Sequence, residues 1–190
     1  HGHSMTEKEL DFILNKIANY FKIKNRKPVI VFHASEPLLV KEMLFKAIDR
    51  FRDSFYFGIQ TNALLLEKGD VGFFKNYRVS IGISLDAADM HTNNRLRYSR
   101  LQGGNFQKAV SAIKWFRGYK GLNVITTMTK FNIHKLAPLV KFLHKKGVGC
   151  VLINPVRLTQ KNSRYLRPND KIMAKYFLKA VDEAIRRSMN

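Results

Sequence analysis

The segment Val29–Leu39, with the sequence VIVFHASEPLL, decides the fold class of this 190-residue chain. Its first four residues are all apolar, and an apolar run without alternation is typical of a parallel strand covered on both faces. A short polar turn follows, and Pro37 suits the first turn of a helix, where no N–H is needed. We therefore expect a central strand over residues 29–32, followed by a helix with Ser35 as its N-cap.

Glu36 lies in the turn between this strand and the helix. A carboxylate beside a helix N-terminus can receive an ammonium group or several N–H donors, or it can simply complement the helix dipole. The local sequence alone favours the second interpretation and leaves the first one open.

The order of strand and helix recurs along the rest of the chain. Strands are expected at residues 29–32, 55–59, 78–84, 122–128 and 149–153. Helices are expected to begin near residues 6, 38, 63, 105, 132 and 169, with a capping box at Thr6 and Glu9, a cap at Asn105 and a stop at Gly147. This alternation predicts an α/β fold with neighbouring parallel strands, in an open sheet or one curled towards a barrel.

Polar side chains follow every expected strand, and residues 86–104 form an unusually long polar connection. Ligands of parallel α/β folds bind at the carboxyl ends of the strands. The sequence thus predicts one polar cluster made by His33, Ser35, Glu36, Gln60, Thr61, Asn62, Ser84, Asp86, Thr127, Thr129 and Asn154. Such groups suit a small zwitterionic molecule better than a flat nucleic-acid surface.

Composition limits the classes of protein and of site. An apolar fraction of 45% suits one compact domain, and 34 Lys and Arg against 14 Asp and Glu give a net charge of +20. This charge favours anionic partners, nucleic acid included, or reflects a basic surface without a specific ligand. Cys150, the single cysteine, is expected to be structural, and alone it excludes a disulfide or a cysteine-ligated cluster built from this chain.

Several motifs are missing from the sequence. No GxGxxG or GxxxxGK[ST] pattern is present, which argues against nicotinamide and P-loop nucleotide sites. The histidines lack a metal-ligand spacing such as HExxH. Residues 1–4 resemble a tag remnant, and neither a membrane-spanning run nor a secretory signal is recognisable, so no membrane partner and a cytoplasmic location are expected.

Three ordered motifs resemble those of one enzyme family. Phe32–Leu39 (FHASEPLL) resembles the FxGGEPLL segment of radical S-adenosylmethionine enzymes, and Ile59–Ala63 (IQTNA) resembles their IQTNG segment. Ile83–Asp86 (ISLD), followed by His91 and Arg95, resembles ISLDG…HD…R. The motif sequences are most similar to those of the sulfatase-maturase and peptide-modifying branch. The resemblance covers about residues 7–158.

The resemblance implies a TIM-barrel-like partial (β/α) barrel that lacks its first strand. It implies binding of S-adenosylmethionine against a [4Fe–4S] cluster and reductive cleavage to a 5′-deoxyadenosyl radical. The chemistry that this resemblance implies is peptide or protein modification by the whole enzyme. The implied cofactor-binding residues are Ser35, Glu36, Gln60, Thr61, Asn62, Ser84, Asp86 and Arg95. Among them, Ser35 and Glu36 would hold the methionine ammonium group, while Ser84 and Arg95 would contact ribose or carboxylate.

The sequence also departs from the family pattern. Ala34, Ser35, Ala63 and Ala87 replace glycines, and the CxxxCxxC loop that holds the cluster is absent. We expect a core domain at residues 5–158 and a basic linker and helix at residues 159–190. The chain is expected to be an inactive fragment, because the cluster requires a longer chain that contains the missing cysteine loop. The alternative is a degenerate, cluster-free binding or scaffold domain, with nucleic acid as one partner to consider.

Overall fold

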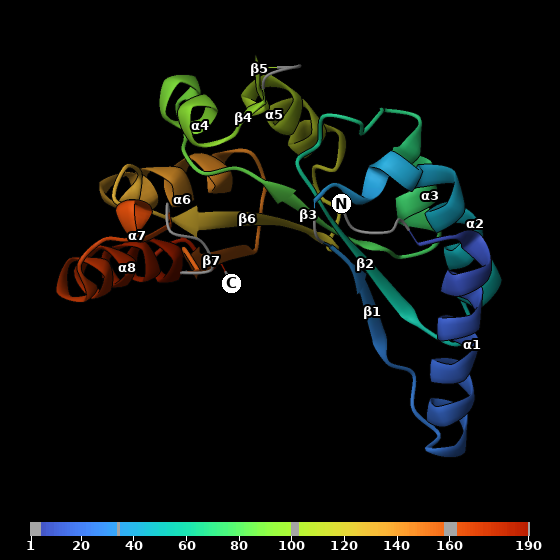
Figure 1. Cartoon of the computed structure of the whole chain (residues 1–190). Coiled ribbons are helices and arrows are strands. Elements are labelled where there is room, and N and C mark those ends of the chain that lie inside the picture. Colours follow the sequence, from blue (N-terminus) through green and yellow to red (C-terminus); the bar gives the residue numbers. More distant parts are fainter. Residues whose placement is uncertain (1–4, 34, 100–102, 158–162, 190) are drawn as a thin grey trace.

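The computed structural model describes residues 5–33, 35–99, 103–157 and 163–189. Its main sheet has five parallel strands in the spatial order β1-β2-β3-β6-β7, so each strand lies beside its predecessor in this series. The strands are β1 (Val29–Phe32), β2 (Tyr56–Thr61), β3 (Ser80–Ser84), β6 (Leu122–Met128) and β7 (Val151–Pro155). The sheet is curved into half of a barrel, which confirms the predicted fold class (Figure 1).

Helices connect the strands. They are α1 (Glu7–Ile23), α2 (Lys41–Phe51), α3 (Asp70–Asn76), α4 (Met90–Leu96), α5 (Phe106–Trp115), α6 (Leu136–Lys145), α7 (Ser163–Leu166) and α8 (Asp170–Ile185), with 3₁₀ helices η1 (Pro37–Val40) and η2 (Ile133–Lys135). The predicted capping box starts α1, since the Glu9 amide donates to the Thr6 hydroxyl and the Thr6 amide donates to the Glu9 carboxylate. Gly147, with a φ of 81°, ends α6 as predicted.

Two local predictions are wrong. No helix begins at Ala63, because this residue has a positive φ of 66° and the chain turns until α3 starts at Asp70. Ser35 is not an N-cap; Glu36 takes that position at η1, where its carboxylate accepts a hydrogen bond from the Leu38 amide. Ser35 instead lies in the turn before this cap, with a positive φ of 26°.

The hydrophobic core lies between the helices and one face of the sheet (Figure 1). Ile59, Ile81 and Val124 point to this face of the sheet and are at most 1% exposed. The other face carries apolar side chains that remain exposed, such as Tyr56 at 55% and Leu152 at 44%. The half-barrel therefore presents an open inner face, as expected for a curved sheet covered on one side only.

The prediction that residues 29–32 form a central strand is also wrong. Strand β1 is at the edge of the sheet, where β2 is its only partner among the described residues. Ile30 and Phe32 pack against the core, whereas Val29 and Val31 are 61% and 43% exposed. An all-apolar run therefore does not distinguish a covered strand from an edge strand whose inner face is open.

The connection from β3 to α5 is more ordered than the predicted polar loop. It contains α4 and an antiparallel pair, β4 (Tyr98–Ser99) with β5 (Gly103–Gly104). Asp89 starts α4 by accepting a hydrogen bond of 2.8 Å from the Thr92 amide. The connection thus has its own local caps and turns.

Helix α8 packs against the core through Ala180, which is 1% exposed. The predicted boundary at residue 158, the tag-like residues 1–4 and the substitution at Ala34 lie outside the described residues. Within the described part, no helix combines the length and hydrophobicity needed to cross a membrane.

Candidate functional site

A polar pocket of about 390 Å³ opens at the carboxyl ends of β2 and β3. It is lined by Ser35, Gln60, Thr61, Asn62, Leu64, Ser84, Leu96, Arg97, Tyr98 and Asn105. Ser35, Gln60, Thr61, Asn62 and Ser84 are predicted site residues that the parallel topology brings to one place. The volume is in the range of small-molecule sites in proteins.

Glu36 lies next to this pocket and ties two strand ends together. Its Oε1 accepts hydrogen bonds from the Thr61 hydroxyl at 2.8 Å and the Leu38 amide at 3.1 Å. Its Oε2 accepts one hydrogen bond, of 2.8 Å, from the Asn62 amide. Because a carboxylate oxygen accepts about two hydrogen bonds, Oε2 retains capacity for one more donor.

Asn105 forms the floor of the pocket and is only 1% exposed. Its amide nitrogen donates to the carbonyl of Asn62 at 2.8 Å and to that of Ser84 at 2.9 Å, while its oxygen accepts from Asn93 at 2.8 Å. Asn105 occupies the predicted N-cap position of α5, but its side chain makes no cap hydrogen bond there. Its geometry instead fixes the ends of β2 and β3 relative to each other.

Asp86 is buried and paired rather than free to bind a ligand through both oxygens. Its carboxylate lies 2.8 Å from Arg97 Nε, accepts from Arg97 Nη2 at 3.0 Å, and accepts from the Thr127 amide at 2.7 Å. Asp86 is 4% exposed, so this ion pair and its hydrogen bonds offset the cost of burying the charges. The pair places Arg97 at the pocket wall.

Arg95, the predicted guanidinium of the site, does not line the pocket. Its guanidinium carbon lies 4.5 Å above the centroid of the Phe131 ring, in a cation–π contact. The sequence gives no means of distinguishing Arg95 from Arg97, because both lie at the end of the same short helix. The structure brings Arg97 and not Arg95 to the strand-end pocket.

Other predicted members of the cluster lie outside the pocket. Thr129 is engaged by Asn132, whose Oδ1 accepts hydrogen bonds from the Thr129 amide at 2.7 Å and hydroxyl at 2.9 Å. The Asn132 amide nitrogen donates to the carbonyls of Asp86 and Thr127. Asn154 lines an apolar cavity beside α8 instead. Thr129 and Asn132 thus extend the hydrogen-bond network at the strand ends, whereas Asn154 belongs to a different cavity.

Several pocket groups have unused hydrogen-bonding capacity. The Gln60 side-chain amide and the Ser84 hydroxyl make no hydrogen bond with the described residues. The same holds for the side-chain nitrogen Nδ2 of Asn62, whose Oδ1 accepts from the Leu64 amide. The side-chain amide nitrogens of Asn105 and Asn132, in contrast, each donate two hydrogen bonds. Partly buried donors and acceptors without protein partners are normally satisfied by water or by a ligand.

Asp89, at the start of α4, is the site-adjacent carboxylate with the largest change in acidity. Burial raises its pKa, but the Thr92 amide at 2.8 Å and the Lys135 ammonium at 2.9 Å stabilise the anion. The balance lowers the pKa of Asp89 to about 2. The carboxylate therefore remains charged at neutral pH and holds α4 beside the pocket.

Sequence comparison identifies the family. Residues 2–143 match the model of the radical SAM superfamily, so the chain belongs to that superfamily. An uncharacterized protein of Archaeoglobus fulgidus is 39% identical over 184 residues, covering 97% of this chain and 42% of the relative. A cysteine-type anaerobic sulfatase-maturating enzyme of Clostridium novyi is 24% identical over 147 residues, covering 73% of this chain and 39% of that enzyme. The chain thus spans about two fifths of these relatives.

Solved structures show the same fold. The structure described as native anSMEcpe with bound AdoMet and Cp18Cys peptide has a TM-score of 0.79 at 18% identity, over 95% of this chain and 52% of that one. Streptococcus suis SuiB bound to precursor peptide SuiA has a TM-score of 0.73 at 16% identity, over 100% of this chain and 42% of that one. The match to the family model confirms the predicted family membership. These structural similarities confirm the partial barrel.

The family implies two bound groups, S-adenosylmethionine and a [4Fe–4S] cluster, and the residues of this chain fit the first but not the second. The strand-end pocket offers a carboxylate oxygen, amides and hydroxyls to a zwitterionic ligand such as S-adenosylmethionine. The whole chain has a single cysteine, and the described residues contain no group of three metal-ligating side chains. These residues do not fit a [4Fe–4S] cluster held by cysteine thiolates.

Sequence reasoning missed Arg97 and Asn93 and assigned Asn105 a different role. Asn93 donates to Asn105 and accepts from the Asp86 amide at 2.9 Å, and is 0% exposed. The one available signal was the clustering of three asparagines, 93, 94 and 105, around a long connection. Asn93 and Asn105 bond to each other's side chains, and Asn105 also bonds to the backbone carbonyls of Asn62 and Ser84, so these pairings depend on the tertiary fold.

Proposed function

We propose that this chain is the S-adenosylmethionine-binding part of a radical SAM enzyme that modifies a peptide or protein. The observation that carries the proposal is the strand-end pocket, in which the residues of three family-like motifs line one cavity with unused donors and acceptors. The open inner face of the sheet is a surface available for the substrate. Peptide-bound neighbours of the same fold support this substrate class.

Within this proposal each group has a chemical task. Oε2 of Glu36 accepts the ligand's ammonium group, because it has one free acceptor position and a charge of the right sign. Gln60 and Ser84 supply neutral hydrogen bonds to ribose hydroxyls. Arg97 takes the carboxylate-binding task expected of Arg95, since Asp86 engages two of its nitrogens and leaves another N–H group available.

The residues of this chain do not fit a [4Fe–4S] cluster, so a cluster would need cysteine ligands other than those of residues 1–190. Bound S-adenosylmethionine provides the 5′-deoxyadenosyl group on which the chemistry of the family is based. The role of this chain is to hold and orient that molecule at the mouth of the half-barrel. Glu36, Thr61 and Asn105 fix the pocket before the ligand arrives, and such preorganisation lowers the entropic cost of binding.

Binding of S-adenosylmethionine to the 190-residue chain tests the proposal. Titration followed by NMR should shift the amide signals of Thr61, Asn62 and Ser84 in a saturable manner. Glu36→Gln, which retains an acceptor and removes the charge, should weaken binding about tenfold, the effect of losing one charge-assisted hydrogen bond.

Glu42→Gln provides the matched control, because this residue on α2 is exposed and does not line the strand-end pocket. Its affinity should equal that of the wild type. Saturable shifts confined to other surfaces, or equal affinity of Glu36→Gln and the wild type, would refute the assigned pocket.

A further inference from the structure

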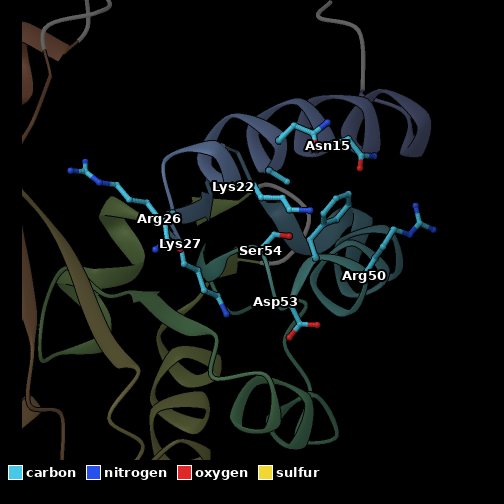
Figure 2. A pocket seen from close by; sticks show the side chains of 11 residues that line it. Asn15, Lys22, Arg26, Lys27, Arg50, Asp53 and Ser54 are labelled. Atoms are coloured by element: carbon cyan, nitrogen blue, oxygen red, sulfur yellow. The ribbon is translucent and has the colours of Figure 1, made fainter.

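A second, larger cavity lies at the opposite end of the sheet. Its volume is about 700 Å³, and it is bounded by α1, the turn after α1 and the turn between α2 and β2 (Figure 2). Its polar lining includes Asn15, Asn19, Lys22, Arg26, Lys27 and Ser54. Lys27 and Ser54 precede β1 and β2, whereas the strand-end pocket follows these strands, and no residue lines both cavities.

Backbone hydrogen bonds fix one wall of this cavity. After α1 the chain turns back through Asn25, which has a positive φ of 48°. The Asn25 amide donates to the carbonyl of Lys22, and the Arg26 amide donates to that of Phe21, both at 3.1 Å. This pattern is a Schellman motif, and it holds Arg26 directly beside the last turn of α1.

The opposite wall is joined to the first by a lysine. Lys27 Nζ donates a hydrogen bond of 2.8 Å to the carbonyl of Arg52 in the turn after α2. The Ser54 amide in the same turn donates to the carbonyl of Phe51 at 3.0 Å. Both walls are therefore fixed by hydrogen bonds within the protein, so the cavity is formed before any ligand binds.

The lining carries an excess of positive charge. The lining contains four basic residues and one acidic residue, Asp53, whose side chain is 96% exposed. The basic residues are Lys22, Arg26, Lys27 and Arg50. Arg50 is paired with Asp11. In the described part of the chain, neither Lys22 nor Arg26 forms an ion pair, and Figure 2 shows Lys22 and Ser54 directed into the same space.

Neutral groups complete the cavity. Phe51, which is 6% exposed, and Ala18 contribute apolar surface, while Asn15 and Asn19 contribute amides. A phosphoryl group matches such a lining because its oxygens accept several hydrogen bonds and carry charge. The volume exceeds that of a bare anion and leaves space for the rest of a phosphorylated molecule.

We propose that this cavity binds a phosphate-bearing anion, with Lys22 as its unpaired cationic contact and Arg26, whose side chain extends outward in Figure 2, as an unpaired cation at the rim. The phosphate belongs either to a free phosphorylated small molecule or to the backbone of a nucleic acid, which is the same chemistry from two sources. A basic surface with no ligand would also be rich in lysine, but it would not require a preformed cavity around two cations without acidic partners.

Two probes distinguish the sources: inorganic pyrophosphate and a single-stranded oligouridylate RNA. Each is titrated into the 190-residue chain at physiological ionic strength, with backbone amide NMR signals as the measurement. The pocket variant is Lys22→Gln/Arg26→Gln, and the control is Lys8→Gln/Lys120→Gln, which removes the same charge outside the cavity. Thermal unfolding verifies that both variants are folded.

We expect pyrophosphate to shift the amide signals of residues 22–27 and Ser54, and the pocket variant to bind about tenfold more weakly, while the control is unchanged. If the wild type binds RNA but not pyrophosphate, and the pocket variant loses RNA binding, the phosphate belongs to a nucleic-acid backbone. Equal losses in the two variants, shifts at Thr61 and Asn62 instead, or no binding of either probe would overturn the proposal. None of these outcomes depends on S-adenosylmethionine binding.

Discussion

The Thr61 hydroxyl donates a hydrogen bond of 2.8 Å to the carboxylate of Glu36, which joins the last residue of β2 to the turn after β1. The two residues are 25 positions apart in the sequence. The backbone amide of Asn62 donates to the same carboxylate, so Glu36 links the two strand ends. Among the described residues, the carboxylates of Glu36 and Asp86 are the two that form hydrogen bonds with residues lining the strand-end pocket.

Removal of this tie should lower stability. Glu36→Ala leaves three donors without their acceptor, and we expect the free energy of unfolding to fall by about 2–3 kcal/mol, the scale of losing hydrogen bonds to a charged group. Glu36→Gln should lose less than about 1 kcal/mol, since its oxygen still accepts. Urea denaturation measures both, and equal stability of the two variants would contradict the role of the carboxylate as an acceptor.

Asn105→Ala should destabilise the fold more than most surface changes. It leaves the carbonyls of Asn62 and Ser84 without their donor and Asn93 without its acceptor, all near the buried floor of the pocket. We expect a loss of about 2–4 kcal/mol in the free energy of unfolding.

Asn19→Ala, at an exposed position, is the control for the Asn105 prediction and should change stability by less than about 0.5 kcal/mol. A small effect of Asn105→Ala, similar to that of the control, would show that water replaces the amide at the strand ends. Chemical denaturation under identical conditions provides the comparison.

Ser35→Gly should stabilise the turn after β1. Ser35 is exposed and has a φ of 26°, a region that glycine occupies without a steric cost. Relief of this steric cost should raise the free energy of unfolding by up to about 1 kcal/mol. The gain is limited because glycine is more flexible in the unfolded chain. Ser35→Ala keeps the steric cost and should give no gain, so an equal gain from both variants would rule out backbone strain as the cause.

Asp89 should make stability depend on acid pH. Its pKa of about 2 in the folded protein is below the ordinary value of 3.8, so the folded state favours the anion. The stabilisation is present above about pH 4 and is lost as the pH falls towards 2. The carboxylate is 45% exposed, so its contribution should be below about 1 kcal/mol.

Asp89→Asn tests this pH dependence, because asparagine also caps helices and removes only the charge. The wild type should be more stable than the variant at pH 7 and pH 5, and the difference should shrink below pH 4. Urea denaturation across this range measures it. A difference that stays constant down to pH 3 would contradict the assignment to Asp89.

The 190-residue chain should not hold a [4Fe–4S] cluster by itself. Such a cluster requires several cysteine thiolates, and Cys150 is the single cysteine of the sequence. Anaerobic reconstitution followed by iron analysis and electron paramagnetic resonance should detect no stoichiometric cluster. Formation of a stable cluster together with 5′-deoxyadenosine would contradict this expectation.

Much of the fold follows from patterns that are local in sequence. The strand at residues 122–128 agrees with β6 at both ends, and the capping box at Thr6 starts α1 as predicted. Apolar periodicity and caps involve neighbours within a few residues, so the sequence displays them directly. The edge position of β1 was not predictable in this way, because it depends on which strand lies beside it.

The candidate site shows the same division. Strand-end polar residues such as Gln60 and Ser84 were predictable because parallel topology gathers the carboxyl ends of strands. The presence of Arg97 rather than Arg95 at the pocket was not predictable. It depends on the rotation of the short helix α4 and on the buried position of Asp86. Long-range amide bridges such as that of Asn105 leave no periodic signal in the sequence.

The open edge of β1 affects how the chain behaves at high concentration. Its outer backbone groups are available to a further strand, and Val29 and Val31 are exposed beside them, which favours edge-to-edge aggregation between copies. The net charge of +20 opposes such contacts by mutual repulsion. Because salt screens this repulsion over distances of about 10 Å at 0.1 M, solubility should fall as ionic strength rises.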